Sequence, residues 1–176
     1  MKINQFSYFS KIKNIPNGIT FFRILLIFPI ILFLEIDLKH YVWYLILIGG
    51  VSDYIDGFLA KKFNQESILG AIIDPLADKI FIIILLTWLC IEQIIPYWSF
   101  SLIIFRELII SSIRVSKDNG MPAMKIAKYK SFFQFLSLLL IFYPVKTDIT
   151  MYLGLTFYWL SFILCIFSLF IYLRFK

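Results

Sequence analysis

Cysteine, histidine and charge are all scarce in this sequence. Among 176 residues there are two cysteines, one histidine and 16% charged residues, while 61% of the residues are hydrophobic. The two cysteines, Cys90 and Cys165, lie within apolar runs and exclude a disulfide framework. The low charge excludes a soluble globular domain, in which about 25% of residues are charged, and the high hydrophobicity excludes disorder. These absences indicate a membrane protein with several spans, forming one domain over residues 1–176.

Long apolar runs are abundant instead. A helix needs about 20 predominantly apolar residues to cross the hydrocarbon core of a bilayer, and six runs approach that length. They are Ile19–Ile36, Tyr41–Ile55, Leu69–Ile91, Tyr97–Ile113, Ile126–Val145 and Met151–Leu173. Six spans with short connections use almost the whole chain, so we predict an all-α membrane protein with six transmembrane helices.

Most basic residues lie on one side of these six runs. The N-terminal tail, the second and fourth connections and the C-terminal end hold Lys2, Lys11, Lys13, Lys61, Lys62, Arg114, Lys117, Lys125, Lys128, Lys130, Arg174 and Lys176. The opposite connections hold only Lys39 and Lys146. Because basic loops remain on the cytoplasmic side of a membrane, both termini are predicted to be cytoplasmic.

Residues 1–15 form a juxtamembrane N-terminal segment that mixes aromatic, aliphatic and lysine residues. Its part Phe6–Ile15 is compatible with an amphipathic helix lying along the membrane surface, and an unstructured basic tail is the alternative. The formal net charge of +6 suits an anionic leaflet or an acidic substrate. Nucleic acid is excluded as a partner, because the basic residues lie at the ends of apolar runs and not on one soluble face.

Four aspartates lie within or at the ends of the second and third apolar runs. Asp53 and Asp56 are three residues apart, and Asp74 and Asp78 are four apart, so each pair projects from one face of a helix. The connection between the two runs is short, which makes the helices antiparallel neighbours and brings both pairs together near the cytoplasmic end. A charge in the centre of a bilayer costs about 2.5–3.5 kcal/mol, so a cation is expected to compensate this cluster.

The donor atoms of this cluster indicate which cation it binds. Carboxylates without a nearby histidine or cysteine favour Mg²⁺ or Mn²⁺ over Zn²⁺. Four carboxylates are enough for two ions about 4 Å apart, an arrangement used in phosphoryl displacement. Gly57 and Gly70 flank the cluster and permit close approach of a helix or a ligand. A structural packing motif with charged loop ends is the alternative, but it leaves the spacing of the four aspartates unexplained.

The same segment resembles the signature of the CDP-alcohol phosphatidyltransferase family, D-x2-D-G-x2-A-R-x8-G-x3-D-x3-D. The matching residues are Asp53, Asp56, Gly57, Ala60, Gly70, Asp74 and Asp78. Lys61 replaces the arginine of the signature, which keeps the charge but loses the bidentate fork, so phosphate binding there is expected to be weaker or less directional. Residues 14–23 and the basic residues from Arg106 to Lys130 resemble the bacterial branch of the family that uses glycerol 3-phosphate.

The resemblance implies a reaction and a location. The phosphatidyl group of CDP-diacylglycerol would pass to sn-glycerol 3-phosphate, with CMP as the leaving group, in a homodimer of the bacterial inner membrane whose active site faces the cytoplasm. Phosphatidylglycerol, serine and inositol phosphate are the alternative acceptors within the family. Outside it, a non-enzymatic cation-binding module such as a carrier is the alternative, although a carrier usually places its acidic residues near the midplane.

The resemblance also implies roles for individual residues. Asp78 is the expected general base, and the metal ligands are Asp53, Asp56, Asp74 and Asp78. The expected contacts of the CDP-linked lipid are Asn17, Thr20, Arg23, Asp56, Gly57, Ala60, Lys61 and Gly70. The expected contacts of the glycerol phosphate are Arg106, Arg114, Lys125, Lys128 and Lys130.

Simpler interpretations exist for some of these residues. Arg23 would snorkel to the interface, Asn17 would cap the first helix, and the residues from Arg106 to Lys130 would form an ordinary positive-inside loop that contacts lipid headgroups.

Overall fold

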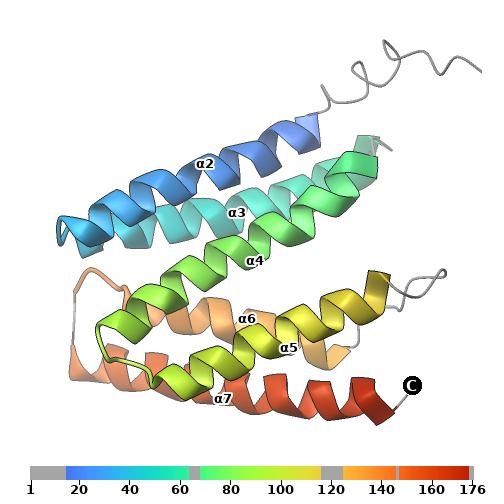
Figure 1. Cartoon of the computed structure of the whole chain (residues 1–176). Helices are drawn as coiled ribbons and strands as arrows, with labels where there is room; N and C mark the ends of the chain where they lie inside the picture. Colours follow the sequence, from blue (N-terminus) through green and yellow to red (C-terminus); the bar gives the residue numbers. More distant parts are fainter. Residues whose placement is uncertain (1–14, 64–67, 116–124, 146, 175–176) are drawn as a thin grey trace, which may run out of the picture. The chain divides into compact units, whose positions relative to one another are not determined.

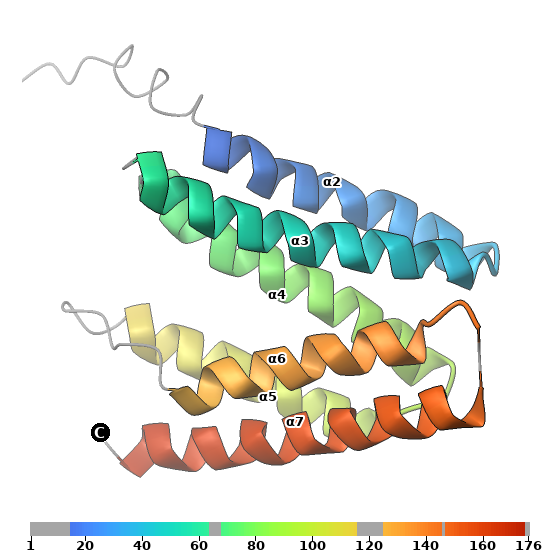
Figure 2. The ribbon, with the colours of Figure 1, turned by 180° about the vertical axis from the view of Figure 1, so that it is seen from behind.

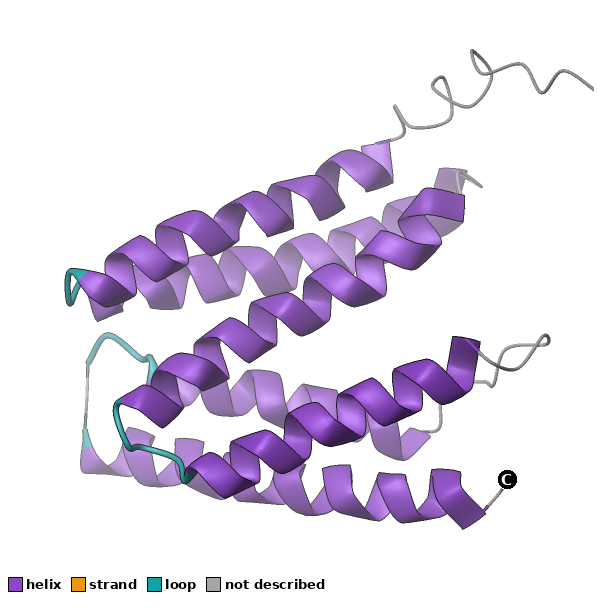
Figure 3. Cartoon of the chain, in the orientation of Figure 1, coloured by secondary structure: helices purple, strands orange, loops and turns teal. Residues whose placement is uncertain are grey.

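The computed structural model describes residues 15–63, 68–115, 125–145 and 147–174, which form helices and no strand (Figures 1 and 3). The helices are α2 (Ile15–Glu35), α3 (Lys39–Phe63), α4 (Ile68–Ile91), α5 (Tyr97–Val115), α6 (Lys125–Ile141) and α7 (Asp148–Arg174). The prediction of an all-α fold is therefore confirmed for these residues. The predicted amphipathic helix Phe6–Ile15 lies outside the described residues except for Ile15, where α2 begins.

Several helices differ in extent from the apolar runs that predicted them, and α3 and α6 differ at their C-terminal ends. Helix α3 continues past Ile55 to Phe63, because the backbone hydrogen bonds of a helix form regardless of whether side chains are polar. Its 25 residues span about 37 Å at 1.5 Å per residue, longer than the roughly 30 Å hydrocarbon core. Helix α6 ends at Ile141 and not at Val145, because Pro144 disfavours a helical conformation in the residue before it.

Tight turns end α2 and α4 without glycine. Asp37 and Gln93 adopt left-handed backbone conformations, with φ of 60° and 57°. In the first turn, Leu38 N donates to Phe33 O (2.8 Å) and Asp37 N to Leu34 O (3.4 Å), and in the second Ile94 N donates to Leu89 O (2.9 Å) and Gln93 N to Cys90 O (3.1 Å). These are Schellman caps, and they explain how such short connections reverse the chain.

The chain packs as two compact units, one ending at Ile84 and the other beginning at Leu85. In the first unit, α2 packs along α3 (Figure 2), and Ile30 of α2 and Val42 and Ile46 of α3 are at most 1% exposed. Gly49 lets α4 approach α3, since a Cβ atom built there would lie 2.6 Å from Cζ of Phe81. Close contact between these helices is what a site formed by both of them requires.

In the second unit, α7 packs against both α6 and α5. The core includes Leu85 and Leu89 of α4, Leu138 of α6 and Tyr158 of α7, each 0% exposed. The hydroxyls of Ser99 and Tyr158 lie 2.6 Å apart, which satisfies two polar groups inside this apolar core.

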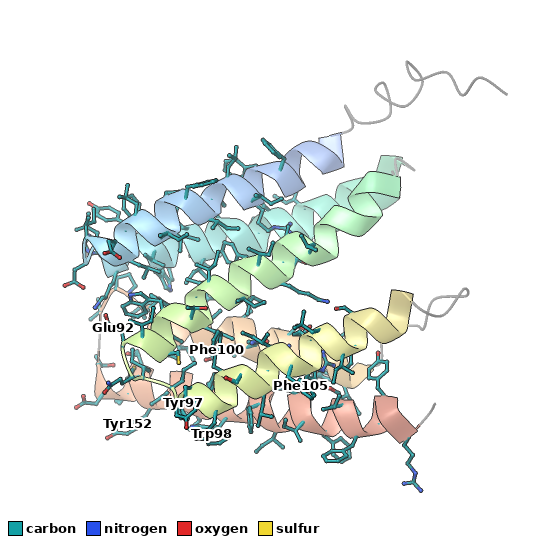
Figure 4. The ribbon with its side chains drawn as sticks, viewed as in Figure 1. Glu92, Tyr97, Trp98, Phe100, Phe105 and Tyr152 are labelled. Atoms are coloured by element: carbon teal, nitrogen blue, oxygen red, sulfur yellow. The ribbon has the colours of Figure 1, made fainter. Side chains whose placement is uncertain are left out.

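Many large apolar side chains remain on the outside of both units. Phe28, Ile149 and Phe170 are 66–70% exposed, and apolar surface of this extent suits contact with lipid or protein more than with water. Tyr97, Trp98 and Tyr152 lie at the end of the second unit where α5 and α7 begin (Figure 4), as in an aromatic belt at a membrane interface.

Among the described residues, Asp148–Tyr172 of α7 has the length and composition of a membrane-crossing helix. The six predicted spans and the cytoplasmic termini stay predictions.

Candidate functional site

Arg23 of α2 is a buried cation of the first unit, with a side chain only 2% exposed. Its Nη1 forms an ion pair with Oδ1 of Asp78 in α4, and its Nε donates a hydrogen bond to Oγ of Ser52 in α3 at 3.5 Å. Ser52 in turn donates to the carbonyl oxygen of Gly49 at 2.7 Å. One guanidinium therefore joins three helices.

This guanidinium brings together the two helices that carry the aspartates. Ser52 immediately precedes Asp53 in the sequence, so α3 at the first aspartate and α4 at the last one both lie next to Arg23. The Asp78 side chain is 40% exposed while that of Arg23 is buried, so Asp78 is the more accessible member of the pair. The burial of Arg23 disfavours the alternative that it snorkels to the interface.

For the other predicted residues of this site, the structure gives the helix in which each lies but not the side chain. Asp53, Asp56, Gly57, Ala60 and Lys61 lie in the C-terminal half of α3, Gly70 and Asp74 in the first turns of α4, and Asn17 and Thr20 in the first turns of α2. The side chains of these nine residues lie outside what the structure describes. The C-terminal end of α3 and the N-terminal end of α4 lie close together in both views (Figures 1 and 2), as the short connection predicted.

The four predicted ligands have the chemistry of a divalent-cation site, and the structure describes the side chain of one of them. Among the side chains that the structure describes, no group of three or more His, Cys, Asp or Glu residues gathers, and three of the four predicted ligands are not among those side chains. Asp78 is the described one, and it faces the junction of α2, α3 and α4. Carboxylate oxygens contributed by two neighbouring helices are the ligands that Mg²⁺ and Mn²⁺ prefer.

A second polar cluster lies in the other unit, formed by Arg106 and Glu107 of α5, Lys130 of α6 and Ser168 of α7. Glu107 Oε1 accepts from Arg106 Nη1 at 2.8 Å and from Lys130 Nζ at 2.5 Å. Arg106 also donates to Oγ of Ser168, from Nε at 3.1 Å and from Nη2 at 2.7 Å. Arg106 and Lys130 are each 4% exposed, so both cations are held inside the bundle.

The structure separates the predicted glycerol-phosphate residues into different surroundings. It brings Arg106 and Lys130 together, whereas Lys128 is exposed. Arg114 and Lys125 lie in the last turn of α5 and the first turn of α6, and their side chains are not described. The interpretation of Arg106 and Lys130 as parts of an ordinary surface loop does not fit their burial.

Ser168 is the member of this cluster that sequence reasoning missed. The apolar pattern of the last helix suggested only a membrane span. The available signal was a small polar residue repeated within an apolar helix, because Ser161 and Ser168 are both buried and lie on one helical face.

Glu107 is expected to hold the two cations together. In a Glu107→Gln variant, Arg106 and Lys130 would remain buried beside each other without a counter-charge, which should lower the free energy of unfolding by about 2–3 kcal/mol. Thermal unfolding of the purified protein in detergent measures this. Glu35→Gln, at an exposed position at the end of α2, is the control, and an equal melting temperature for both variants would contradict the expectation.

Comparison with known proteins gives a consistent result. The family model described as CDP-alcohol phosphatidyltransferase matches residues 13–169. A Wigglesworthia glossinidia brevipalpis protein named CDP-diacylglycerol–glycerol-3-phosphate 3-phosphatidyltransferase is 33% identical, over 89% of this chain and 91% of that protein. A Blochmanniella floridana protein of the same name is 36% identical, over 77% of this chain and 76% of that protein.

A further relative carries a different name. The Schizosaccharomyces pombe cardiolipin synthase (CMP-forming) / mitochondrial hydrolase fusion protein is 36% identical over 70% of this chain and 21% of that protein.

Proposed function

Because the chain belongs to the CDP-alcohol phosphatidyltransferase family, we propose that it transfers the phosphatidyl group of CDP-diacylglycerol to sn-glycerol 3-phosphate and releases CMP. The observation that carries this proposal is that Arg23 contacts Ser52 of α3, the residue before Asp53, and Asp78 of α4. This supports a site formed by the two helices that carry the aspartate signature. The names of relatives that cover almost the whole chain support glycerol 3-phosphate as the acceptor.

The reaction exchanges a phosphoanhydride bond for a phosphate ester bond at the lipid-side phosphorus. The primary hydroxyl of glycerol 3-phosphate attacks the lipid-side phosphorus, the bond from that phosphorus to the bridging oxygen breaks, and CMP leaves with this oxygen. Asp78 accepts the proton of the attacking hydroxyl, and its partial exposure is consistent with contact with the acceptor. Arg23 holds the Asp78 carboxylate in place and neutralises part of the negative charge gathered at the junction.

The remaining site residues bind the two substrates and the metal. Asp53, Asp56, Asp74 and Asp78 would hold two Mg²⁺ or Mn²⁺ ions, which would supply charge neutralisation and substrate positioning when bound. The CDP-linked lipid would contact Asn17, Thr20, Arg23, Asp56, Gly57, Ala60, Lys61 and Gly70. Arg106, Arg114, Lys125, Lys128 and Lys130 would attract the phosphate of the acceptor.

The proposed setting is a bacterial inner membrane. The protein would cross it with six helices, keep both termini and the active site on the cytoplasmic side, and form a homodimer. Its exposed apolar side chains and the apolar α7 support a membrane environment. The length of α3, about 37 Å, supports a position of the Asp53–Asp56 segment near the interface, where a water-soluble acceptor has access.

Phosphatidylglycerol is the second candidate acceptor, because one relative is named as a cardiolipin synthase. The buried cluster of Arg106 and Lys130, which carries a net positive charge after pairing with Glu107, favours an acceptor with a free phosphate monoester. Such a phosphate carries more negative charge than the diester of phosphatidylglycerol.

Release of CMP from CDP-diacylglycerol by the purified protein tests the proposed function. Glycerol 3-phosphate, phosphatidylglycerol, serine and inositol phosphate are offered separately, with Mg²⁺, with Mn²⁺, or with EDTA. Metal-dependent release with glycerol 3-phosphate alone is expected. Release with another acceptor would replace the acceptor in the proposal, and no release with any acceptor by folded protein would favour a non-enzymatic cation-binding module.

Lys130 and Lys128 provide a matched test of the acceptor site. Lys130→Gln removes a buried cation of the cluster, so the KM for glycerol 3-phosphate should rise about tenfold, while Lys128→Gln removes an exposed cation, whose attraction is screened by solvent, and should raise this KM only about twofold. Steady-state kinetics at saturating CDP-diacylglycerol measure both values. Equal increases of KM in the two variants would show that acceptor binding depends on the overall positive charge and not on the position of Lys130.

A further inference from the structure

Ser168 of α7 contacts a cation that the proposed function assigns to the acceptor. Its Oγ accepts two hydrogen bonds from Arg106, from Nε at 3.1 Å and Nη2 at 2.7 Å. These two nitrogens form one edge of the planar guanidinium, so a single oxygen at that edge sets the plane and direction of the whole group. Both side chains are buried, at 0% and 4% exposed.

The direction of the Ser168 hydroxyl is itself determined. Its proton is donated to the carbonyl oxygen of Cys165, one turn earlier in α7, at 2.8 Å. A hydroxyl has one proton and two lone pairs, so the lone pairs remain for Arg106. The serine is therefore a fixed acceptor.

Ser168 orients Arg106 without neutralising it. Glu107 is the carboxylate of this cluster, and Arg106 shares it with Lys130, which leaves one net positive charge. Arginine has five N–H donors, and the contacts with Ser168 and Glu107 engage three of them. Within the part of the chain that the structure describes, one N–H on each terminal nitrogen thus remains for a ligand, with a charge that attracts an anion.

We propose that Ser168 is a positioning residue that orients the Arg106 guanidinium for the phosphate of the acceptor substrate. This proposal rests on the proposed function. The arginine side chain carries about 2 kcal/mol of rotamer entropy, and holding it in one orientation before the substrate arrives removes part of that loss from binding. The effect should therefore be seen in the affinity for the acceptor and not in the chemical step.

Ser161 supplies a matched control on the same helix. It is 1% exposed, and its hydroxyl also donates to the carbonyl one turn earlier, that of Tyr158, at 2.8 Å. Among the described residues, no hydrogen bond joins Ser161 to an arginine. Ser161→Ala therefore removes the same group from the same kind of environment without touching Arg106.

Kinetics of the full-length protein test this role. Ser168→Ala should raise the KM for glycerol 3-phosphate about fivefold, because part of the rotamer entropy of Arg106 would then be lost when the acceptor binds, with kcat and the KM for CDP-diacylglycerol changed less than twofold. Ser161→Ala should leave all three within twofold. If Ser168→Ala reduces the yield of folded protein, Ser168→Cys places a slightly larger side chain with a weaker acceptor at this position and should raise the same KM.

A double-mutant cycle separates positioning from a general effect on structure. In an Arg106→Ala background, Ser168→Ala should change kcat/KM for glycerol 3-phosphate less than twofold, since no guanidinium is left to orient. An undiminished fivefold effect in that background, or equal KM values for the Ser168→Ala and Ser161→Ala variants, would overturn the inference.

Different experimental outcomes would overturn the proposed function and this inference. No turnover of the wild-type protein with glycerol 3-phosphate would overturn the acceptor assignment alone. Equilibrium binding of inorganic phosphate to the wild type and to both serine variants then still tests Ser168. Binding about fivefold weaker in Ser168→Ala alone supports the inference, and equal dissociation constants overturn it.

Discussion

Asp78→Asn should reduce kcat for CMP release about 10³-fold. The amide has the size of the carboxylate but does not accept the proton of the attacking hydroxyl, and general-base catalysis contributes about 10²–10⁴-fold. The substitution also removes one negative charge from the set expected to bind metal. The accessible position of Asp78 beside the buried Arg23 is the structural reason to expect the largest loss here. Single-turnover CMP release at saturating concentrations of both substrates measures it.

The control for this variant is Asp37→Asn. Asp37 is an exposed aspartate in the turn after α2, and its side chain pairs with Lys39 at 2.8 Å, so it is also an acidic partner of a cation, but outside the proposed site. It should keep at least half of the wild-type kcat. An Asp78→Asn variant that kept more than a tenth of wild-type activity would show that Asp78 is neither the base nor a required ligand.

Arg23→Gln should reduce kcat about 10²-fold. The guanidinium connects α3 at Ser52 with α4 at Asp78, and without it the carboxylate would be displaced by repulsion from the other aspartates. A displacement of about 1 Å at a reacting group costs on the order of 100-fold in rate. The melting temperature should also fall, because the Asp78 carboxylate loses its ion pair with Arg23 in a partly buried position.

Lys39→Gln is the matched control, since it breaks the Lys39–Asp37 pair, whose acidic side chain is 80% exposed. An exposed pair contributes about 0–1 kcal/mol, so activity should be unchanged.

The kinetics of the Arg23→Gln variant also distinguish two roles of Arg23. A lower kcat at unchanged KM indicates positioning of Asp78, whereas a higher KM for CDP-diacylglycerol at unchanged kcat would show that Arg23 acts only by binding the lipid diphosphate.

Local patterns in the sequence were sufficient for the helices and for the family. Apolar runs predicted six helices because backbone polar groups in an apolar setting must be paired within the segment. Asp53 and Asp56 are three residues apart and Asp74 and Asp78 are four apart, as the repeat of a helix requires for residues on one face. These two pairs predicted an acidic face on each of two neighbouring helices. The extent of α3 beyond Ile55 was missed, because apolarity marks the part of a helix suited to lipid and not where its hydrogen bonds end.

Contacts between residues that are distant in the sequence were determined only by the tertiary structure. The sequence indicated Arg23 as a lipid contact, but its pairing with Asp78, 55 residues away, depends on how α2 and α4 pack. Arg106 and Lys130 were predicted to face the same substrate as Lys128, and packing buried the first two and left the third exposed.

Residues of one helix are related by its repeat, which the sequence displays directly. Contacts between helices depend on how whole side-chain surfaces fit together, which no single segment displays. For that reason the sequence by itself determined the helical fold, the family and the candidate aspartates. Only the packing of α7 showed that Ser168, in a helix without a recognisable motif, holds Arg106.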